Sequence, residues 1–215
     1  MSIRLYSYWR STAAYRVRIA LNAKGIEYDT VTVSLLPGRS EHRGTDYRAR
    51  NPQMLVPFLE EGDFGVAQSM AILEYLEETH PRPALLPEDA RQRAAVRAFC
   101  NSICCDVHPL NNLRVLSYLK ENFGVSDPQR DAWYAHWIHE SFRAAEITAA
   151  QHGGPFVFGD CLSLADACLV PQIYNARRFE VALDDYPRLV AADAHCRTRP
   201  AFVAAAPDSQ PDCPS

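Results

Sequence analysis

Residues 3–33 read IRLYSYWRSTAAYRVRIALNAKGIEYDTVTV and place one helical pattern between two strand-like segments. Ile3 to Tyr6 is a short apolar segment that is typical of a strand. Apolar side chains at 13, 17, 20 and 21 then recur at helical spacing, and Tyr28 to Val33 alternates like a second strand. A strand, about a dozen helical residues and another strand predict a βαβ unit, in which the two strands are parallel.

The ends of that helix carry residues that usually start and stop helices. Ser11 and Thr12 precede the apolar pattern and suit the N-cap, while Gly25 suits the position after the last turn. The basic residues of this segment lie off the apolar stripe; they are Arg16, Arg18 and Lys24.

The next segments predict a β-hairpin and a helix. A strand-like run at Leu55–Leu59 is followed by the turn residues Glu61-Gly62-Asp63 and a second short run. Pro57 restricts the first run to an edge or a special turn, where a cis peptide bond is possible. Ser69 is then expected to cap a helix over residues 70–78.

Two domains are expected, joined by the proline-rich linker from His80 to Pro87. Residues 1–82 predict an α/β domain in the order βαβ and then ββα, and residues 88–215 predict an all-helical domain. Pro109 is expected to kink a long helix, because it lacks the backbone N–H that the helix needs there. The expected helical segments are 89–123, 130–150, 163–178 (starting with a capping box at Ser163 and Asp166), 186–197 and 200–205, before an extended tail from Pro207.

Composition excludes several classes of function. The 215 residues carry 22 Lys and Arg against 26 Asp and Glu, a net charge of −4 that argues against nucleic-acid binding. No apolar run reaches the ~18 residues of a membrane span, and no signal peptide is evident. The seven cysteines are odd in number and all lie after residue 99, which fits apolar packing in a reducing compartment. We expect a cytoplasmic protein without nucleic-acid or membrane partners.

The first candidate site is the start of the first helix. The hydroxyls of Ser11 and Thr12 lie where unpaired N–H groups and the helix dipole favour an anion, and such a place stabilises a thiolate. No cysteine is present here, so an anion at this helix must come from a ligand. The alternative is an ordinary helix cap.

The second candidate combines Val56-Pro57 with Gln68-Ser69. A proline that ends strand pairing leaves neighbouring backbone groups able to pair with an extended peptide, and Ser69 at a helix start can hold a carboxylate. The alternative is a hairpin followed by a cap.

The third candidate is the polar segment around Pro109. His108, Asn111 and Asn112 interrupt an otherwise apolar helix, and this cluster is either a helix–helix hydrogen-bond network or the wall of a binding site. Cys100, Cys104 and His108 step by four, but no fourth ligand has usable spacing, so a metal site is not expected.

The fourth candidate is the pair Arg177-Arg178 at the end of a helix. Cations there match the helix dipole, and guanidinium groups also bind carboxylates through two hydrogen bonds. Arg10 can play the same part from the other domain, so a small dicarboxylate is a candidate ligand.

Together these features resemble the zeta class of the glutathione S-transferases, which includes maleylacetoacetate isomerases and bacterial maleylpyruvate isomerases. The N-terminal signature is residues 6–21, YSYWRSTAAYRVRIAL. Further similar stretches are Asn51-Pro52-Gln53, Val56-Pro57, Gln68-Ser69, residues 74–78 (EYLEE), Leu85-Leu86-Pro87, Asp106 to Arg114, residues 169–172 (LVPQ), Arg177-Arg178-Phe179 and the Gln210-Pro211-Asp212 tail.

The resemblance implies a thioredoxin-like first domain, a helical second domain and a homodimer with the glutathione S-transferase fold. It implies that glutathione supplies a thiolate that adds reversibly to a maleyl double bond, so that the bond can rotate. The implied catalytic residues are Ser11, Thr12, Arg10 and Arg178. The implied glutathione-site residues are Ser11, Thr12, Ala13, His42, Val56, Pro57, Gln68, Ser69, Asp106, Val107, His108, Asn112, Leu113 and Arg114, with no metal.

One departure from the family pattern matters, the loss of a cysteine. The usual Ser-Ser-Cys of the class is Ser11-Thr12-Ala13 in this chain. Because glutathione supplies the thiolate in the family, loss of this cysteine is expected to weaken side activities more than isomerisation. The expected reaction is maleylacetoacetate to fumarylacetoacetate, in the breakdown of tyrosine and other aromatic compounds. Maleylpyruvate isomerisation and general transfer or dehalogenation of small acids are the alternatives.

Overall fold

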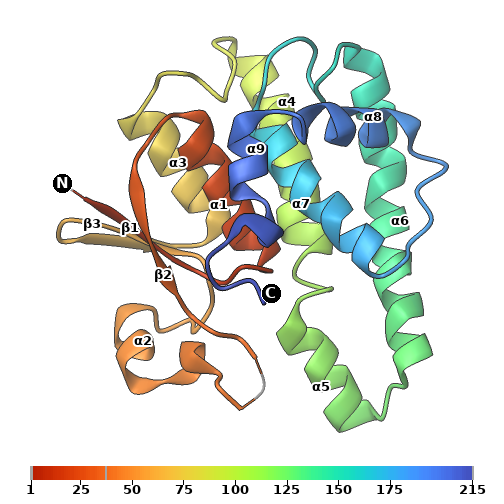
Figure 1. The fold of residues 1–215 in the computed structure, drawn as a ribbon. Helices are drawn as coiled ribbons and strands as arrows, with labels where there is room; N and C mark the ends of the chain where they lie inside the picture. The colour runs from red at the N-terminus through yellow and green to blue at the C-terminus, as the bar shows by residue number, and fades with distance from the viewer. Residues whose placement is uncertain (1, 37, 215) are drawn as a thin grey trace. The chain divides into compact units, whose positions relative to one another are not determined.

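The computed structural model describes residues 2–36 and 38–214. The chain forms two compact units (Figure 1). The N-terminal unit consists of Met1–Leu85 together with Thr198–Ser215, and the helical unit is Leu86–Arg197. The expected helical domain, 88–215, therefore differs at its C-terminal end, because the last segment packs with the N-terminal unit.

The N-terminal unit is built on one four-stranded sheet (Figure 1). Its strand order is β2-β1-β3-β4; β1 is parallel to β2 and antiparallel to β3, and β3 pairs with β4 as a hairpin. This confirms the predicted βαβ and ββα order. In chain order the elements are β1 (Ile3–Ser7), α1 (Thr12–Ala23), β2 (Tyr28–Thr32), the 3-10 helix η1 (Glu41–Arg43), α2 (Thr45–Arg50), β3 (Phe58–Glu61), β4 (Phe64–Ala67) and α3 (Ser69–Thr79).

Helix α1 is buried along almost its whole length. Every residue from Thr12 to Leu21 is buried, including Arg16 and Arg18, although the sequence pattern placed both arginines off the apolar stripe. The reason is that α1 packs against both α3 and α9 (Pro200–Ala205), so it has no solvent-facing side. A single apolar stripe describes a helix that is covered on one side only.

The C-terminal segment completes this unit. The Arg18 Nε donates to the Ala205 carbonyl at 2.9 Å, and the Asn22 side chain donates to the Ala201 carbonyl at 3.1 Å. After α9 the chain forms a short 3-10 helix, η3 (Pro207–Ser209), so the tail is not extended as expected. The C-terminal segment thus supports α1, a helix near the start of the chain.

The helical unit contains the kink expected at Pro109. Helix α4 (Ala90–Asn101) continues into a π-helical segment, η2 (Ser102–Val107), and α5 (Leu113–Phe123) starts after an irregular turn. His108 donates its backbone N–H to the Ile103 carbonyl, five residues earlier, which is the bonding of a wider helical turn. The missing N–H of Pro109 ends the regular pattern there.

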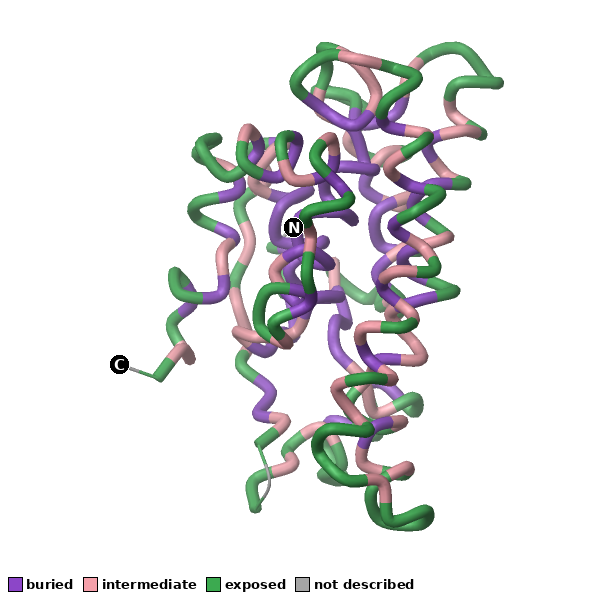
Figure 2. The backbone as a smooth tube through the Cα atoms, turned by 90° about the vertical axis from the view of Figure 1, so that its right-hand side faces the viewer, coloured by how far each residue is buried: buried purple, intermediate pink, exposed green. Residues whose placement is uncertain are grey.

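The remaining helices of this unit are α6 (Asp127–His152), α7 (Leu164–Arg178) and α8 (Pro187–Cys196). Buried positions recur every three or four residues along α6, from Tyr134 to Ala149. Figure 2 shows buried, intermediate and exposed backbone along the chain. The capping box at the start of α7 is confirmed: the buried Asp166 carboxylate accepts from the Ser163 backbone and hydroxyl and from Val157 N. No helix of residues 2–36 and 38–214 is long and apolar enough to cross a membrane.

Candidate functional site

Ser11, one of the two residues predicted to suit the N-cap, is the N-cap of α1, and Thr12 is the first helical residue. The Ser11 Oγ accepts a hydrogen bond from the Ala14 backbone N–H at 3.2 Å, and the Ser11 carbonyl accepts from Tyr15. Ser11 is half-buried, whereas Thr12 and Ala13 are buried. Because the cap uses a lone pair of the Ser11 oxygen, the hydroxyl proton is still available to donate to an anion outside the helix.

The loop that presents Ser11 is tied down from two directions. The buried guanidinium of Arg18 donates to the Ser7 hydroxyl at 3.0 Å and to the carbonyls of Tyr8 and Trp9 at 3.4 and 3.0 Å. The Trp9 backbone N–H donates to an Asp212 carboxylate oxygen at 2.9 Å. Arg10 follows this fixed point, and its guanidinium carbon lies 5.2 Å from the centre of the Trp9 ring.

Val56 and Pro57 lie at the start of β3 and are joined by the cis bond that the sequence suggested. The pairing of β1 with β3 begins at Tyr6 and Phe58, so the backbone of Val56 lies beyond the last strand pair. The preceding loop is fixed by the Tyr47 hydroxyl, which donates to the Leu55 carbonyl at 2.6 Å.

The start of α3 differs from the expectation that Ser69 is its cap. Gln68 occupies the N-cap with a positive φ of 72° and makes no side-chain cap hydrogen bond, and Ser69 is the first helical residue. The Ser69 Oγ instead accepts from Arg16 Nη1 at 3.3 Å, and the Gln68 amide donates to Gln53 at 2.6 Å. Tertiary contact with α1 therefore overrides the local preference of serine for the cap.

Arg16 gives this helix start a positive charge. Its side chain is almost fully buried, and its Nε and Nη2 have no hydrogen-bond partner among the described residues. Because Ser69 accepts from this guanidinium, its own proton is left to donate to a second group. A helix N-terminus, an unoccupied hydroxyl proton and a buried cation together suit a carboxylate.

His42 lies on η1, a separate segment of the N-terminal unit. Its Nδ1 is 3.5 Å from the Ser34 carbonyl. Partial burial lowers the pKa of His42 more than the contact with the Ser34 carbonyl raises it. The ring is therefore neutral at pH 7.

In the helical unit, the predicted segment 106–114 spans the end of η2, the turn and the start of α5. Asn112 caps α5, since its Oδ1 accepts from Arg114 N at 3.1 Å. Asp106 and Leu113 are exposed, whereas Val107 is buried. The Asn111 amide donates to the Tyr134 carbonyl at 3.1 Å, which supports the helix–helix network that the sequence allowed.

The two arginines at the end of α7 have different environments. Arg177 Nη1 is 2.6 Å from an Asp193 carboxylate oxygen, so it is committed to a structural ion pair. The guanidinium carbon of the exposed Arg178 lies 4.6 Å from the centre of the Phe179 ring. No carboxylate of the described residues forms an ion pair with Arg178, so its guanidinium group is able to bind a ligand.

These residues form two groups, one in each unit. Ser11, Thr12 and Ala13 at one helix start, Val56-Pro57 at the sheet edge and Gln68-Ser69 at a second helix start belong to the N-terminal unit. Residues 106–114 and Arg178 belong to the helical unit. Within the described part of the chain, no three His, Cys, Asp or Glu side chains are arranged to hold a metal ion. A cavity of about 560 Å³ beside β2 and α2 is lined by none of the predicted site residues.

Comparison with known proteins finds relatives of the whole chain. Residues 1–78 match the family model of the glutathione S-transferase N-terminal domain. The whole chain is 46% identical over 212 residues to a probable maleylacetoacetate isomerase of Vibrio cholerae serotype O1, covering 99% of both chains. A solved structure of a maleylpyruvate isomerase, described as a bacterial glutathione S-transferase of the zeta class, superposes with a TM-score of 0.95 at 46% identity and covers 98% of this chain and 100% of that one. The chain belongs to the zeta class of the glutathione S-transferases.

A third relative has been solved with ligands. The maleylacetoacetate isomerase of Anaeromyxobacter dehalogenans 2CP-1 is 44% identical, with a TM-score of 0.89 and coverage of 99% of this chain and 98% of that one, in a structure with glutathione bound in its active site. A second structure of that protein contains dicarboxyethyl glutathione and citrate in the active site.

Sequence analysis did not identify the residues that support the candidate site from the interior of the N-terminal unit. Arg16 and Arg18 belong to the N-terminal signature, but their spacing indicated only basic residues off the apolar stripe, whereas this buried arginine pair fixes both the Ser11 loop and Ser69. Asp212 was part of the family likeness, but its bond to Trp9 joins residues 203 positions apart. No local pattern reports such a contact.

Proposed function

We propose that this chain is a glutathione-dependent cis–trans isomerase of a maleyl acid, converting maleylacetoacetate to fumarylacetoacetate in the breakdown of tyrosine and other aromatic compounds. The observation that carries the proposal is the start of α1, which offers the Ser11 hydroxyl to an anion and contains no cysteine. The attacking thiol must therefore come from a bound molecule.

The residues of the N-terminal unit fit glutathione, which is an extended peptide with a thiol and carboxylates. Val56 lies beyond the strand pairing and can bind its backbone, and Ser69 with the partly unpartnered Arg16 can bind a carboxylate. Ser11 would then donate to the sulfur, assisted by the helix dipole. When bound, glutathione supplies the thiolate that adds reversibly to the double bond.

The chain itself has three tasks in this reaction. Ser11 and Thr12 hold the sulfur in its charged form, because a hydrogen bond to a thiolate lowers the thiol pKa. Arg178 and Arg10 orient the carboxylates of the substrate through planar guanidinium groups. These positive charges also stabilise the negative charge that develops on the substrate while its double bond is opened.

The relatives support this chemistry. Dicarboxyethyl glutathione, present in the Anaeromyxobacter dehalogenans structure, is the product expected when the glutathione sulfur adds across the double bond of a four-carbon dicarboxylic acid. Relatives named maleylacetoacetate isomerase and maleylpyruvate isomerase are equally similar, at 46% identity each. Maleylpyruvate therefore remains the second candidate substrate.

We also propose that the enzyme is a cytoplasmic homodimer. The cysteines, all within the described residues, form no disulfide, even though the Cys104 and Cys168 sulfurs are 3.6 Å apart. This suits a reducing compartment.

Phe64 on the edge strand β4 is 44% exposed beside Tyr75, which suits burial against a second subunit. Light scattering during size exclusion would show the dimer mass.

The deciding experiment is an absorbance assay of the purified protein with maleylacetoacetate and with maleylpyruvate, each with and without glutathione. We expect isomerisation of at least one acid and an absolute requirement for glutathione. Equal rates in thiol-free buffer would contradict the proposal. Chlorodinitrobenzene serves as the control substrate: rapid conjugation without isomerisation would indicate a general transferase instead.

A further inference from the structure

Arg178 lies beside an aromatic stack that has no role in the reaction proposed above. The ring of Tyr134 on α6 lies parallel to that of Phe179, with centres 3.8 Å apart and planes 16° apart. Phe179 is the residue after Arg178 and ends α7. The stack therefore joins the helix end that carries Arg178 to the N-terminal part of α6 (Asp127–His152).

The guanidinium of Arg178 lies on this stack, 4.6 Å from the centre of the Phe179 ring. A planar guanidinium is attracted to an aromatic face, and this restricts a long side chain that solvent would otherwise leave mobile. Arg178 is exposed and has no ion pair among the described residues, so its position depends on the aromatic contact and on its interaction with the Tyr134 hydroxyl.

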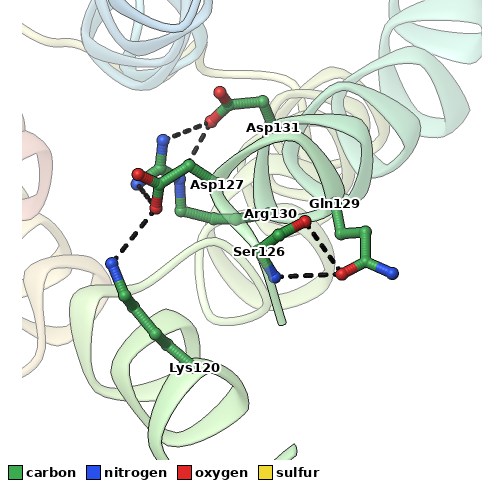
Figure 3. Close-up of polar contacts among 6 residues, drawn as sticks. All are labelled: Lys120, Ser126, Asp127, Gln129, Arg130 and Asp131. Atoms are coloured by element: carbon green, nitrogen blue, oxygen red, sulfur yellow. Dashed lines mark hydrogen bonds and ion pairs between the residues drawn. The ribbon is translucent and has the colours of Figure 1, made fainter. Parts of the chain in front are cut away.

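The neighbouring arginines show why Arg178 differs. Arg130 also lies over Phe179, at 5.8 Å, but its guanidinium is bound by Asp127 at 3.0 Å and Asp131 at 2.8 Å (Figure 3). Arg177 is paired with Asp193. The charges of Arg130 and Arg177 are therefore neutralised by aspartates. Of these three arginines, Arg178 is the one whose charge can bind a ligand.

The Tyr134 hydroxyl is the second part of the arrangement. The residue is 1% exposed, and its oxygen makes no well-formed hydrogen bond within the described residues. Burial raises the pKa of Tyr134 to about 12, against the opposing effect of the nearby Arg178 charge. The hydroxyl is thus neutral and lies close enough to the Arg178 guanidinium to act as its hydrogen-bond acceptor.

Tyr134 is also hydrogen-bonded to the other segment of the helical unit that was predicted to line the site, residues 106–114. The Asn111 amide donates to its carbonyl at 3.1 Å, and the neighbouring Trp133 donates to the Leu110 carbonyl at 3.1 Å. One turn of α6 therefore holds both the stack and the turn that precedes Asn112.

We infer that Tyr134 and Phe179 are positioning residues that hold the guanidinium of Arg178 ready for a carboxylate of the substrate. The inference rests on the proposed function, which gives Arg178 its ligand. Phe179 restricts the guanidinium by stacking, and Tyr134 supports the Phe179 ring and offers its hydroxyl as an acceptor. Substrate binding then requires little further ordering of the arginine.

Tyr134→Phe tests the hydroxyl alone, because the ring stack is kept. We expect KM for the maleyl acid to rise about three- to tenfold, while kcat, KM for glutathione and the melting temperature stay near their wild-type values. Tyr118→Phe, which changes an exposed tyrosine of the same unit, is the matched control and should alter none of these. Phe179→Leu should raise the same KM by more than Tyr134→Phe does, since it removes the stacking surface.

Coupling to Arg178 separates positioning from a structural role. In an Arg178→Lys background, Tyr134→Phe should have no additional effect on KM, because the fork that it positions is absent. An effect of full size in that background would overturn the inference, as would equal increases in both KM values.

A readout without catalysis distinguishes this inference from the proposed function. The side-chain Nε–H resonance of Arg178 should show restricted motion in the wild type and faster motion in Tyr134→Phe and Phe179→Leu. If wild-type protein isomerises no maleyl acid, the proposed function fails, and this resonance still decides the positioning. An Arg178 signal that is equally mobile in all three proteins would refute it.

Discussion

Replacing Ser11 by alanine should cost both stability and activity, and the structure allows the two losses to be separated. The alanine removes the cap bond from Ala14 N to Ser11 Oγ. Loss of such a cap costs roughly 0.5–2 kcal/mol of folding free energy. For a chain of this size each kcal/mol lowers the melting temperature by about 2–4 °C, so a loss of a few degrees is expected.

The loss of activity comes from the proton of the Ser11 hydroxyl, whereas the loss of stability comes from its oxygen. Its proton is not used by the cap and is expected to bind the glutathione thiolate. A hydrogen bond to a charged group contributes roughly 1.5–3 kcal/mol. Its removal should lower kcat/KM on the order of ten- to a hundredfold. It should also raise the pKa of the bound thiol, because the charged form loses a donor, so the rate should reach its plateau at higher pH.

Ser11→Asp is the control that separates the two effects. Its carboxylate still caps α1, so melting should stay close to wild type, but it has no proton to donate and repels a thiolate. The assays are thermal unfolding, kcat/KM across pH and the ultraviolet absorbance of the thiolate in the glutathione complex. Thr12→Ala should cost less activity, since Thr12 is only 4% exposed. If Ser11→Ala shows wild-type kcat/KM and an unshifted pH profile, backbone N–H groups alone hold the thiolate and this reasoning is refuted.

Three further substitutions test separate parts of the structure. Arg178→Lys keeps the charge but loses the planar guanidinium that forms two hydrogen bonds with a carboxylate. The kcat/KM for the maleyl acid should therefore fall at least about tenfold, while the melting temperature and glutathione affinity stay unchanged. A rate near that of the wild type would contradict the binding of a substrate carboxylate by Arg178. Lys24→Met should cost about 3–5 kcal/mol in urea unfolding, because the buried Lys24 ammonium pairs with Glu77 and donates to the His80 and Pro83 carbonyls. Adding Glu77→Leu should recover only part of the loss, since both carbonyls and the Leu85 N–H that donates to Glu77 then lack these partners. Burial raises the pKa of Tyr47 to about 12, so this phenol favours folding below pH 10 and the benefit is lost as the pH rises from 10 to 12. Tyr47→Phe should therefore flatten the decline of unfolding free energy over that range, and an unchanged slope would count against it.

The regular elements were predictable because local chemistry decides them. Residues 3–33 carry the two strand patterns, the helical spacing and the Ser11 cap that the structure shows. Pro109 marked the break between α4 and α5, since a missing N–H acts within its own turn. The capping box at Asp166 was readable for the same reason.

Features that depend on distant segments were not predictable. The sequence placed Arg16 and Arg18 off a single apolar stripe, but α3 and α9 cover both sides of α1 and bury them. Ser69 has the side chain of a cap, yet its hydroxyl accepts from Arg16 and Gln68 takes the cap position. In each case a contact over more than fifty residues outweighs a local preference of about 1 kcal/mol.

The buried arginines also explain why the end of the chain belongs to a site that lies near its beginning. Arg18 can be buried because its fork is satisfied by carbonyls, and one of these, Ala205, is supplied by α9. The same guanidinium donates to the Trp9 carbonyl, and the Trp9 N–H donates to Asp212. Both backbone polar groups of Trp9 are therefore bonded, one to the buried Arg18 and one to the C-terminal segment. Ser11 is two residues further on, and its hydroxyl can act on a thiolate only if this loop keeps one conformation. The geometry of the Ser11 hydroxyl is therefore set as much by residues 205–212 as by the helix that it caps.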